Sequence, residues 1–218
     1  MKITIIGGHG KVALILSRLL SERGDSVTSI IRNPDQAPAV AATGAHPLVL
    51  DIEGADTPEL AEAFSGSDAL IWSAGAGGGD PDRTYAVDRD AAIRSINAAE
   101  EAGVDRYVMV SFLTADESFL VPLDDPFYPY MAAKITADAH LRSSALKWTI
   151  LAPGRLTDAE GSGLITPDPD PTADTATSRR NVALAAMACL VDPSSIGTTL
   201  GFSDGSIPLS RWIGGLHD

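Results

Sequence analysis

A tyrosine and a lysine stand four positions apart in a segment with a helical pattern. Tyr130 and Lys134 therefore share one face of the helix predicted from about residue 130 to 144. A nearby ammonium lowers the pKa of a phenol, so the pair could act as a general acid or base. The spacing also fits a tyrosine that only packs on the inner face of its helix. Tyr128 is a competing phenol, but six positions place it off the face of Lys134.

A glycine-rich turn near the N-terminus could hold phosphate groups. It reads Gly7, Gly8, His9, Gly10, Lys11, Val12 and Ala13, between a predicted strand and an amphipathic helix. Gly7 permits a sharp exit from the strand, and Gly10 lets the backbone approach a pyrophosphate. The amides and dipole of the helix then face the anion, and His9 is expected to pack over it. The alternative is a tight turn without a ligand, but the strand and helix on either side favour a dinucleotide site.

An arginine follows the second predicted strand, where the adenosine ribose of a dinucleotide lies in such folds. Arg32 could contact a 2′-phosphate with both arms of its guanidinium, whereas an acidic residue would bind the 2′-hydroxyl of NAD. The alternative is an exposed arginine that begins a turn. Lys11 could assist with the phosphates. The sequence therefore favours NADP(H) over NAD(H).

Short apolar strands alternate with helical patterns, which predicts parallel βαβ units. The predicted strands cover residues 3–6, 27–31, 47–50, 68–73, 106–111, 148–151 and 198–202. The helices between them should cover both faces of a doubly wound, Rossmann-type parallel sheet. Residues 114–128 and 157–178 are predicted loops. We expect one α/β domain over residues 1–218, with residues 155–218 as a small C-terminal elaboration on the substrate side.

Bulk composition limits the partners of this chain. The 218 residues carry a formal net charge of −13, which opposes binding to nucleic acid or to an anionic membrane. A hydrophobic fraction of 44% and a mean hydropathy of +0.08 suffice for a sizeable core. Without a secretory signal or an apolar run of about 18 residues, we expect a cytoplasmic monomer or homodimer. His46, His140 and His217 are scattered, so no metal site is expected.

Several short motifs in a fixed order resemble the atypical short-chain dehydrogenase/reductases. The resemblance is to the NAD(P)H-binding group related to NmrA-like and epimerase-like proteins, and it covers nearly the whole chain. Besides the glycine turn, the motifs include Ile31-Arg32-Asn33, Leu50-Asp51, Val87-Asp88, residues 98–104, Val110-Ser111, residues 130–134, residues 148–154 and residues 178–183. The last of these departs from the family pattern, because Asn181 stands where an aspartate is expected.

The resemblance implies roles for further residues. It implies a strand order of about 3-2-1-4-5-6-7, with the cofactor at the switch point between strands one and four. Asp51 and Ile52 would lie beside the adenine, and Pro153 and Gly154 near the nicotinamide. The end of strand four would line the cofactor with Ser73, Ala74 and Gly75.

The resemblance also implies a reaction. Ser111 would position a substrate carbonyl, Tyr130 would handle the proton, and Lys134 would also hold the nicotinamide ribose. The expected activity is NADP-dependent reduction of a small carbonyl or quinone-like substrate by hydride transfer. One alternative is an NmrA-like protein that senses NADP(H) without turnover. A sugar-nucleotide epimerase or dehydratase is less favoured, because only 64 residues follow Gly154.

Overall fold

The computed structural model describes residues 1–78 and 80–215, so His217 lies outside the described part of the chain. Seven parallel strands form the main body of the sheet, in the order β3-β2-β1-β4-β5-β6-β10. They are β1 (Lys2–Ile6), β2 (Ser26–Ile31), β3 (His46–Val49), β4 (Ala69–Trp72), β5 (Arg106–Val110), β6 (Lys147–Pro153) and β10 (Thr198–Asp204). The predicted Rossmann-type fold and its strand order are confirmed.

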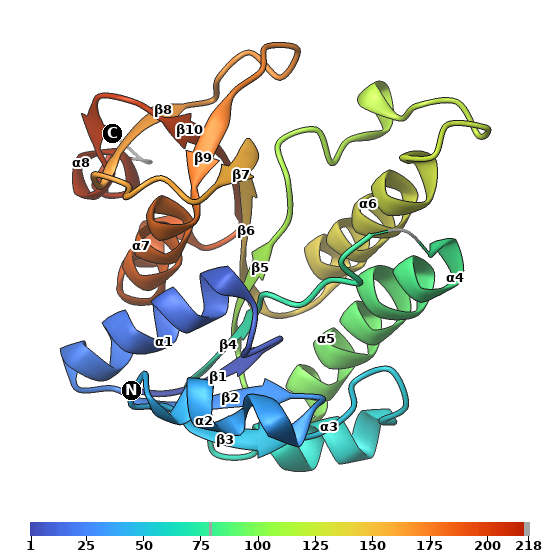
Figure 1. Cartoon of the computed structure of the whole chain (residues 1–218), viewed down its shortest axis with the longest axis vertical. Coiled ribbons are helices and arrows are strands. Elements are labelled where there is room, and N and C mark those ends of the chain that lie inside the picture. The colour runs from blue at the N-terminus through green and yellow to red at the C-terminus, as the bar shows by residue number, and fades with distance from the viewer. Residues whose placement is uncertain (79, 216–218) are drawn as a thin grey trace.

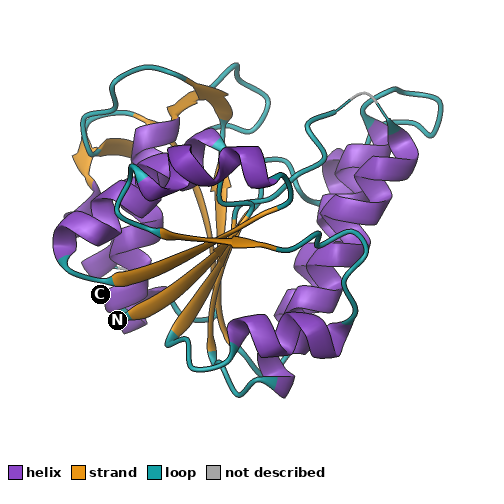
Figure 2. Cartoon of the chain, turned by 60° about the horizontal axis from the view of Figure 1, so that its bottom comes forward, coloured by secondary structure: helices purple, strands orange, loops and turns teal. Residues whose placement is uncertain are grey.

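Helices cover both faces of this sheet, and each face has its own apolar core (Figure 1). One layer holds α1 (Lys11–Arg23), α2 (Ala37–Ala41) and α7 (Arg179–Val191). The opposite layer holds α3 (Thr57–Phe64), α5 (Ala92–Glu101) and α6 (Tyr128–Ser143). Figure 2 shows the strands fanned between the two layers. A sheet buried on both faces explains why its central strands β1, β4 and β5 are mostly apolar.

The region predicted as a loop over residues 157–178 contains strands, so that prediction is wrong in part. Two short strands, β7 (Arg155–Thr157) and β9 (Ala176–Ser178), pair with each other. Another, β8 (Leu164–Pro167), runs antiparallel between β10 and β11 (Ile207–Pro208). The chain then continues into α8 (Leu209–Gly214). The partners of β8 lie more than thirty positions later, so the local Asp- and Pro-rich composition concealed the strand.

The helical segment between β4 and β5 is divided into three parts. It begins as α4 (Pro81–Thr84), widens into a π-helical segment over Tyr85–Ala91, and continues as α5. Such segments are rare and often lie at functional sites. This one carries Asp88, whose side chain is buried beside the glycine-rich loop after β4.

The hydrogen bonds of Asn181 explain why an asparagine stands where the family pattern has an aspartate. Its side-chain amide donates to Asp204 Oδ1 at 2.7 Å and to the Leu164 carbonyl at 3.0 Å. Its carbonyl oxygen accepts the Gly163 amide at 2.8 Å. An aspartate could not donate to Asp204, so the asparagine is the matching partner for that carboxylate.

In residues 1–78 and 80–215, no helix is long and apolar enough to span a membrane.

Candidate active site

The glycine turn brings β1, β2 and β4 unusually close together. Gly7 has a φ of +83°, and a Cβ atom there would lie 2.6 Å from the Cα of Ala74. A Cβ on Gly8 would lie 2.5 Å from the Cβ of Ser29. Both glycines are therefore required by the backbone itself, before any ligand is considered.

The N-terminus of α1 opens from this turn with its amides available. Gly10 is the N-cap, and within the described chain no side chain caps the helix. The first amides of a helix have no intrahelical partners, so those of Lys11, Val12 and Ala13 can bind an anion. This uncapped end above a glycine cradle fits the pyrophosphate of a dinucleotide.

Two cavities flank the turn and meet across it. One has a volume of about 820 Å³ and the other about 260 Å³. Four residues line both cavities, namely Gly10, Ser73, Ala74 and Gly75. They lie at the carboxyl ends of β1 and β4, where the strand order reverses. This switch point is where dinucleotides bind in open parallel sheets, with one half on each side.

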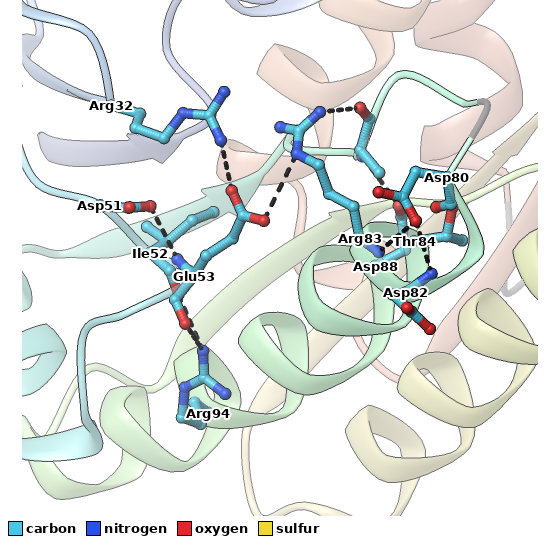
Figure 3. Close-up of polar contacts among 11 residues, drawn as sticks. Arg32, Asp51, Ile52, Glu53, Asp80, Asp82, Arg83, Thr84, Asp88 and Arg94 are labelled. Atoms are coloured by element: carbon cyan, nitrogen blue, oxygen red, sulfur yellow. Dashed lines mark hydrogen bonds and ion pairs between the residues drawn. The ribbon is translucent and has the colours of Figure 1, made fainter.

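The smaller cavity collects the residues predicted for the adenosine half, Arg32, Asp51 and Ile52, together with Gly7 and His9 of the glycine turn. However, the guanidinium of Arg32 is already paired with the carboxylate of Glu53, which was not foreseen. Figure 3 shows Glu53 between Arg32 and a second arginine, Arg83.

The larger cavity brings together Ser111, Tyr130 and Lys134, although Ser111 lies 19 positions before Tyr130. The intervening segment folds back through an aromatic cluster at the mouth of the cavity. The Tyr130 ring lies 5.1 Å from that of Phe112 and 5.2 Å from that of Phe127, measured between centroids. These contacts anchor the start of α6 against the end of β5.

The side chains of Lys134 and Ser111 form hydrogen bonds within the protein, whereas the expected partners are the cofactor and the substrate. Lys134 donates to the carbonyl of Val110 at 2.9 Å, which holds the ammonium at the end of β5. Ser111 donates to Oδ2 of Asp138 at 2.5 Å. Asp138 is fully buried, and its other oxygen has no hydrogen-bond partner among the described residues. A second carboxylate group at the site, that of Asp88, accepts a hydrogen bond from the amide of Ala76 at 2.9 Å, and Asp88 lines the cavity.

The expected lowering of the Tyr130 pKa is wrong. Burial raises the pKa of Tyr130, and the nearby carboxylates of Asp88 and Asp138 raise it further. Burial also raises the pKa of both carboxyl groups, against the attraction of Lys134. The phenol therefore stays protonated at neutral pH, which suits a proton donor better than a base.

Three predicted cofactor residues are placed differently from the rest. Gly8 packs on Ser29, and Pro153 and Gly154 are not among the described residues that line either cavity. A Cβ on Gly154 would lie 2.5 Å from the Thr175 carbonyl oxygen, so this glycine serves chain packing. The proximity of Pro153 and Gly154 to a nicotinamide stays a prediction. Lys11 and Val12 do line the larger cavity, and Lys11 Nζ is bound to Asp158 at 2.6 Å.

Sequence reasoning missed Glu53, Arg83, Asp88 and Asp138 as site residues. Asp138 could have been found, because it lies four positions after Lys134 and eight after Tyr130 on one helical face. Glu53 directly follows the predicted adenine residues, and Asp88 lies in one of the motifs of the resemblance. Arg83 carried no signal of its own. Across the described residues, no group of three or more His, Cys, Asp or Glu could hold a metal.

The parallel sheet, its glycine cradle and the two cavities at the switch point define a Rossmann-type dinucleotide-binding protein. The model of the NAD(P)H-binding family matches residues 7–193. The chain belongs to this family, within the atypical short-chain dehydrogenase/reductases.

Relatives match along almost the whole chain. An uncharacterized sugar epimerase, YhfK of Bacillus subtilis, is 32% identical, over 97% of this chain and 98% of its own. A Bacillus halodurans structure, named for the NAD-dependent epimerase/dehydratase class, has a TM-score of 0.90 at 29% identity and covers 99% of both chains. The oxidoreductase ylbE of Lactococcus lactis has a TM-score of 0.87 at 26% identity, over 99% of this chain and 96% of its own.

Proposed function

We propose that this protein is an NADP(H)-dependent oxidoreductase that reduces a small carbonyl or quinone-like substrate. The observation that carries the proposal is the meeting of Ser111, Tyr130 and Lys134 in the cavity that adjoins the glycine turn. Family membership supports the cofactor class, and the oxidoreductase ylbE supports the reaction class. The bound nicotinamide would supply a hydride to the carbonyl carbon.

Tyr130 is the proton donor in this proposal. Its raised pKa keeps the phenol protonated, so the hydroxyl can pass a proton to the carbonyl oxygen as that oxygen gains charge. The resulting phenolate would be stabilised by the Lys134 ammonium, which Val110 fixes at the end of β5. Lys134 would also hold the nicotinamide ribose. Solvent protonates Tyr130 again after the product leaves.

The lining of the larger cavity favours a flat, apolar substrate. The residues that line it include Leu123, Pro126, Phe127, Pro129 and Leu156, which are apolar or aromatic. A nucleotide-sugar would need a second set of phosphate ligands and many hydrogen-bond donors. The names of two relatives keep the epimerase or dehydratase class as a second candidate, and it predicts that the cofactor is recycled without net consumption.

The preference for NADP(H) depends on Arg32 at the end of β2. Its side chain lines the smaller cavity, where the adenosine ribose would lie. We further propose that residues 155–218 form a substrate-side elaboration, because Leu156 and Arg179 from this region line the larger cavity.

The test follows NADPH absorbance with a panel of aldehydes, ketones and quinones. The wild type should consume NADPH with at least one panel member. Tyr130→Phe should lower turnover about 100-fold or more, with NADPH affinity within about twofold of the wild type. Tyr128→Phe is the matched control, and its turnover should be nearly unchanged. No consumption by the wild type, together with tight NADPH binding, would favour the alternative of a redox-sensing protein without turnover.

A further inference from the structure

The smaller cavity contains two arginines that reach the same carboxylate from different parts of the fold. Arg32 follows β2, and its Nη1 lies 2.5 Å from Glu53 Oε2. Arg83 belongs to α4, and its Nε lies 3.4 Å from Glu53 Oε1. Each guanidinium therefore takes a separate oxygen of the Glu53 carboxylate, and all three residues line the cavity (Figure 3).

Two members of this triad, Glu53 and Arg83, are also held by contacts outside it. Arg94 donates to the carbonyls of Ile52 and Glu53 at 3.0 Å, which fixes the backbone that carries Glu53 (Figure 3). Arg83 also donates to the carbonyl of Ala76, which ties it to the glycine-rich loop after β4. The two guanidinium groups thus reach one carboxylate from different segments of the chain.

The charges at this point are unbalanced. Two guanidinium groups face a single carboxylate, which leaves a net charge of about +1 in the triad. Arg32 is 54% exposed and Arg83 is 37% exposed, so both remain accessible to a ligand in the cavity. A phosphate monoester carries about two negative charges and three acceptor oxygens, so it matches two guanidinium groups better than one carboxylate does.

We infer that Arg83 is a second ligand for the 2′-phosphate of NADP(H), and that Glu53 is the counter-anion that this phosphate displaces. The inference rests on the proposed preference for NADP(H) and adds to it a specificity-determining pair. Glu53 keeps Arg32 and Arg83 from repelling each other when no nucleotide is bound. It also lowers the affinity for the phosphate, because the phosphate must first replace the carboxylate.

Glu53 could instead be a ligand of NAD, and experiment can distinguish this role from that of a displaced counter-anion. An acidic side chain beside the adenosine ribose can accept a hydrogen bond from the 2′-hydroxyl of NAD, and Glu53 lines the cavity where that ribose would lie. In that case Glu53→Gln would weaken NADH and leave NADPH unchanged. A displaced counter-anion predicts the reverse: Glu53→Gln tightens NADPH and leaves NADH nearly unchanged.

The experiment is a calorimetric titration with adenosine 2′,5′-bisphosphate and with 5′-AMP, repeated with NADPH and NADH. Arg83→Ala should weaken the bisphosphate about tenfold and change AMP by less than about twofold. Glu53→Gln should tighten the bisphosphate about threefold or more. Because Arg83 also supports the loop at Ala76, the ratio of the two affinities is the readout, and Glu53→Gln leaves that support intact.

Arg155→Ala and Asp174→Asn are matched controls, since they break an exposed ion pair of 3.0 Å whose members line neither cavity in the described chain. Their affinity ratios should equal that of the wild type. If the wild type binds bisphosphate and AMP equally, both the NADP(H) preference and the arginine pair are wrong. If the wild type prefers bisphosphate but Arg83→Ala and Glu53→Gln keep that preference unchanged, only the arginine pair is wrong.

Discussion

The hydroxyl of Ser111 donates to the buried carboxylate of Asp138 across 2.5 Å, so this serine is bonded toward the protein core. While Asp138 is ionised, Ser111 can offer only its lone pairs to a ligand in the cavity. A protonated Asp138 could instead donate to Ser111 and release the serine hydroxyl to donate to a carbonyl. The charge of Asp138 therefore controls what Ser111 can recognise.

Replacing Asp138 by asparagine should change how stability depends on pH. Burial raises the pKa of Asp138, so the folded chain favours the neutral carboxyl. The contribution of the neutral Asp138 carboxyl to the free energy of unfolding is therefore fully present below the pKa of an exposed aspartate. It is lost as the pH rises through the pKa of Asp138 in the folded state. Urea unfolding should show Asp138→Asn gaining stability relative to the wild type as the pH rises above about 4, the pKa of an exposed aspartate. A stability difference that does not change with pH would contradict the idea.

Replacing Gly7 by alanine should be far more damaging than the same change at Gly103. Both glycines have positive φ, +83° and +69°, so both variants bear the strain of that backbone conformation. Only at Gly7 would the new Cβ overlap the backbone of Ala74, because nothing lies within 4 Å at Gly103. We expect losses in the free energy of unfolding of about 2–5 kcal/mol and about 1 kcal/mol, respectively. Chemical denaturation measures both, and equal losses would show that the close approach is unimportant.

Replacing Asn181 by aspartate should destabilise the C-terminal part of the sheet. The new carboxylate would face Asp204 at the position of a 2.7 Å hydrogen bond, and the Leu164 carbonyl would lose one of its two donors and keep only the Gly205 amide. The free energy of unfolding should fall by about 2–4 kcal/mol at neutral pH. Asn33→Asp keeps an exposed acceptor for the Asp35 amide and should cost less than about 0.5 kcal/mol. A similarly small effect at Asn181 would argue against the buried network.

Replacing Arg106 by lysine should show how much the hydrogen bonds of a buried guanidinium to neutral acceptors contribute to stability. Its guanidinium donates to the carbonyls of Lys147 and Cys189 and to the hydroxyls of Thr149 and Ser195, joining β5, β6 and α7. Lysine cannot reproduce this fork, so we expect a loss of about 2–4 kcal/mol in thermal or urea unfolding. Arg155→Lys, at an exposed pair, should change stability by less than about 1 kcal/mol. Equal losses of stability in Arg106→Lys and Arg155→Lys would mean that the positive charge of Arg106, and not its set of hydrogen bonds, contributes to stability.

The fold could be predicted because its signals are local. The apolar strands, the glycine turn and the intervening helical patterns each occupy a short stretch, and parallel βαβ units have few ways to connect. Helical spacing likewise paired Tyr130 with Lys134, while Ser111 came from the family resemblance, and all three line the larger cavity.

Other features depended on residues that are distant in the sequence. The strand β8 forms only because β10 and β11 offer it partners, and the bonding of Ser111 depends on a carboxylate 27 positions later. The pKa of Tyr130 is raised because folding removes water from the phenol and brings two carboxylates near it.

The sequence by itself determined the Rossmann-type sheet, the phosphate turn and the residue types available for proton transfer. Only the tertiary structure decided which charges meet, as when Glu53 lies between Arg32 and Arg83 from three separate elements. The physical reason is that strand and turn propensities act over a few neighbouring residues. Pairing, burial and the resulting pKa shifts depend on distances in space that the chain acquires only on folding.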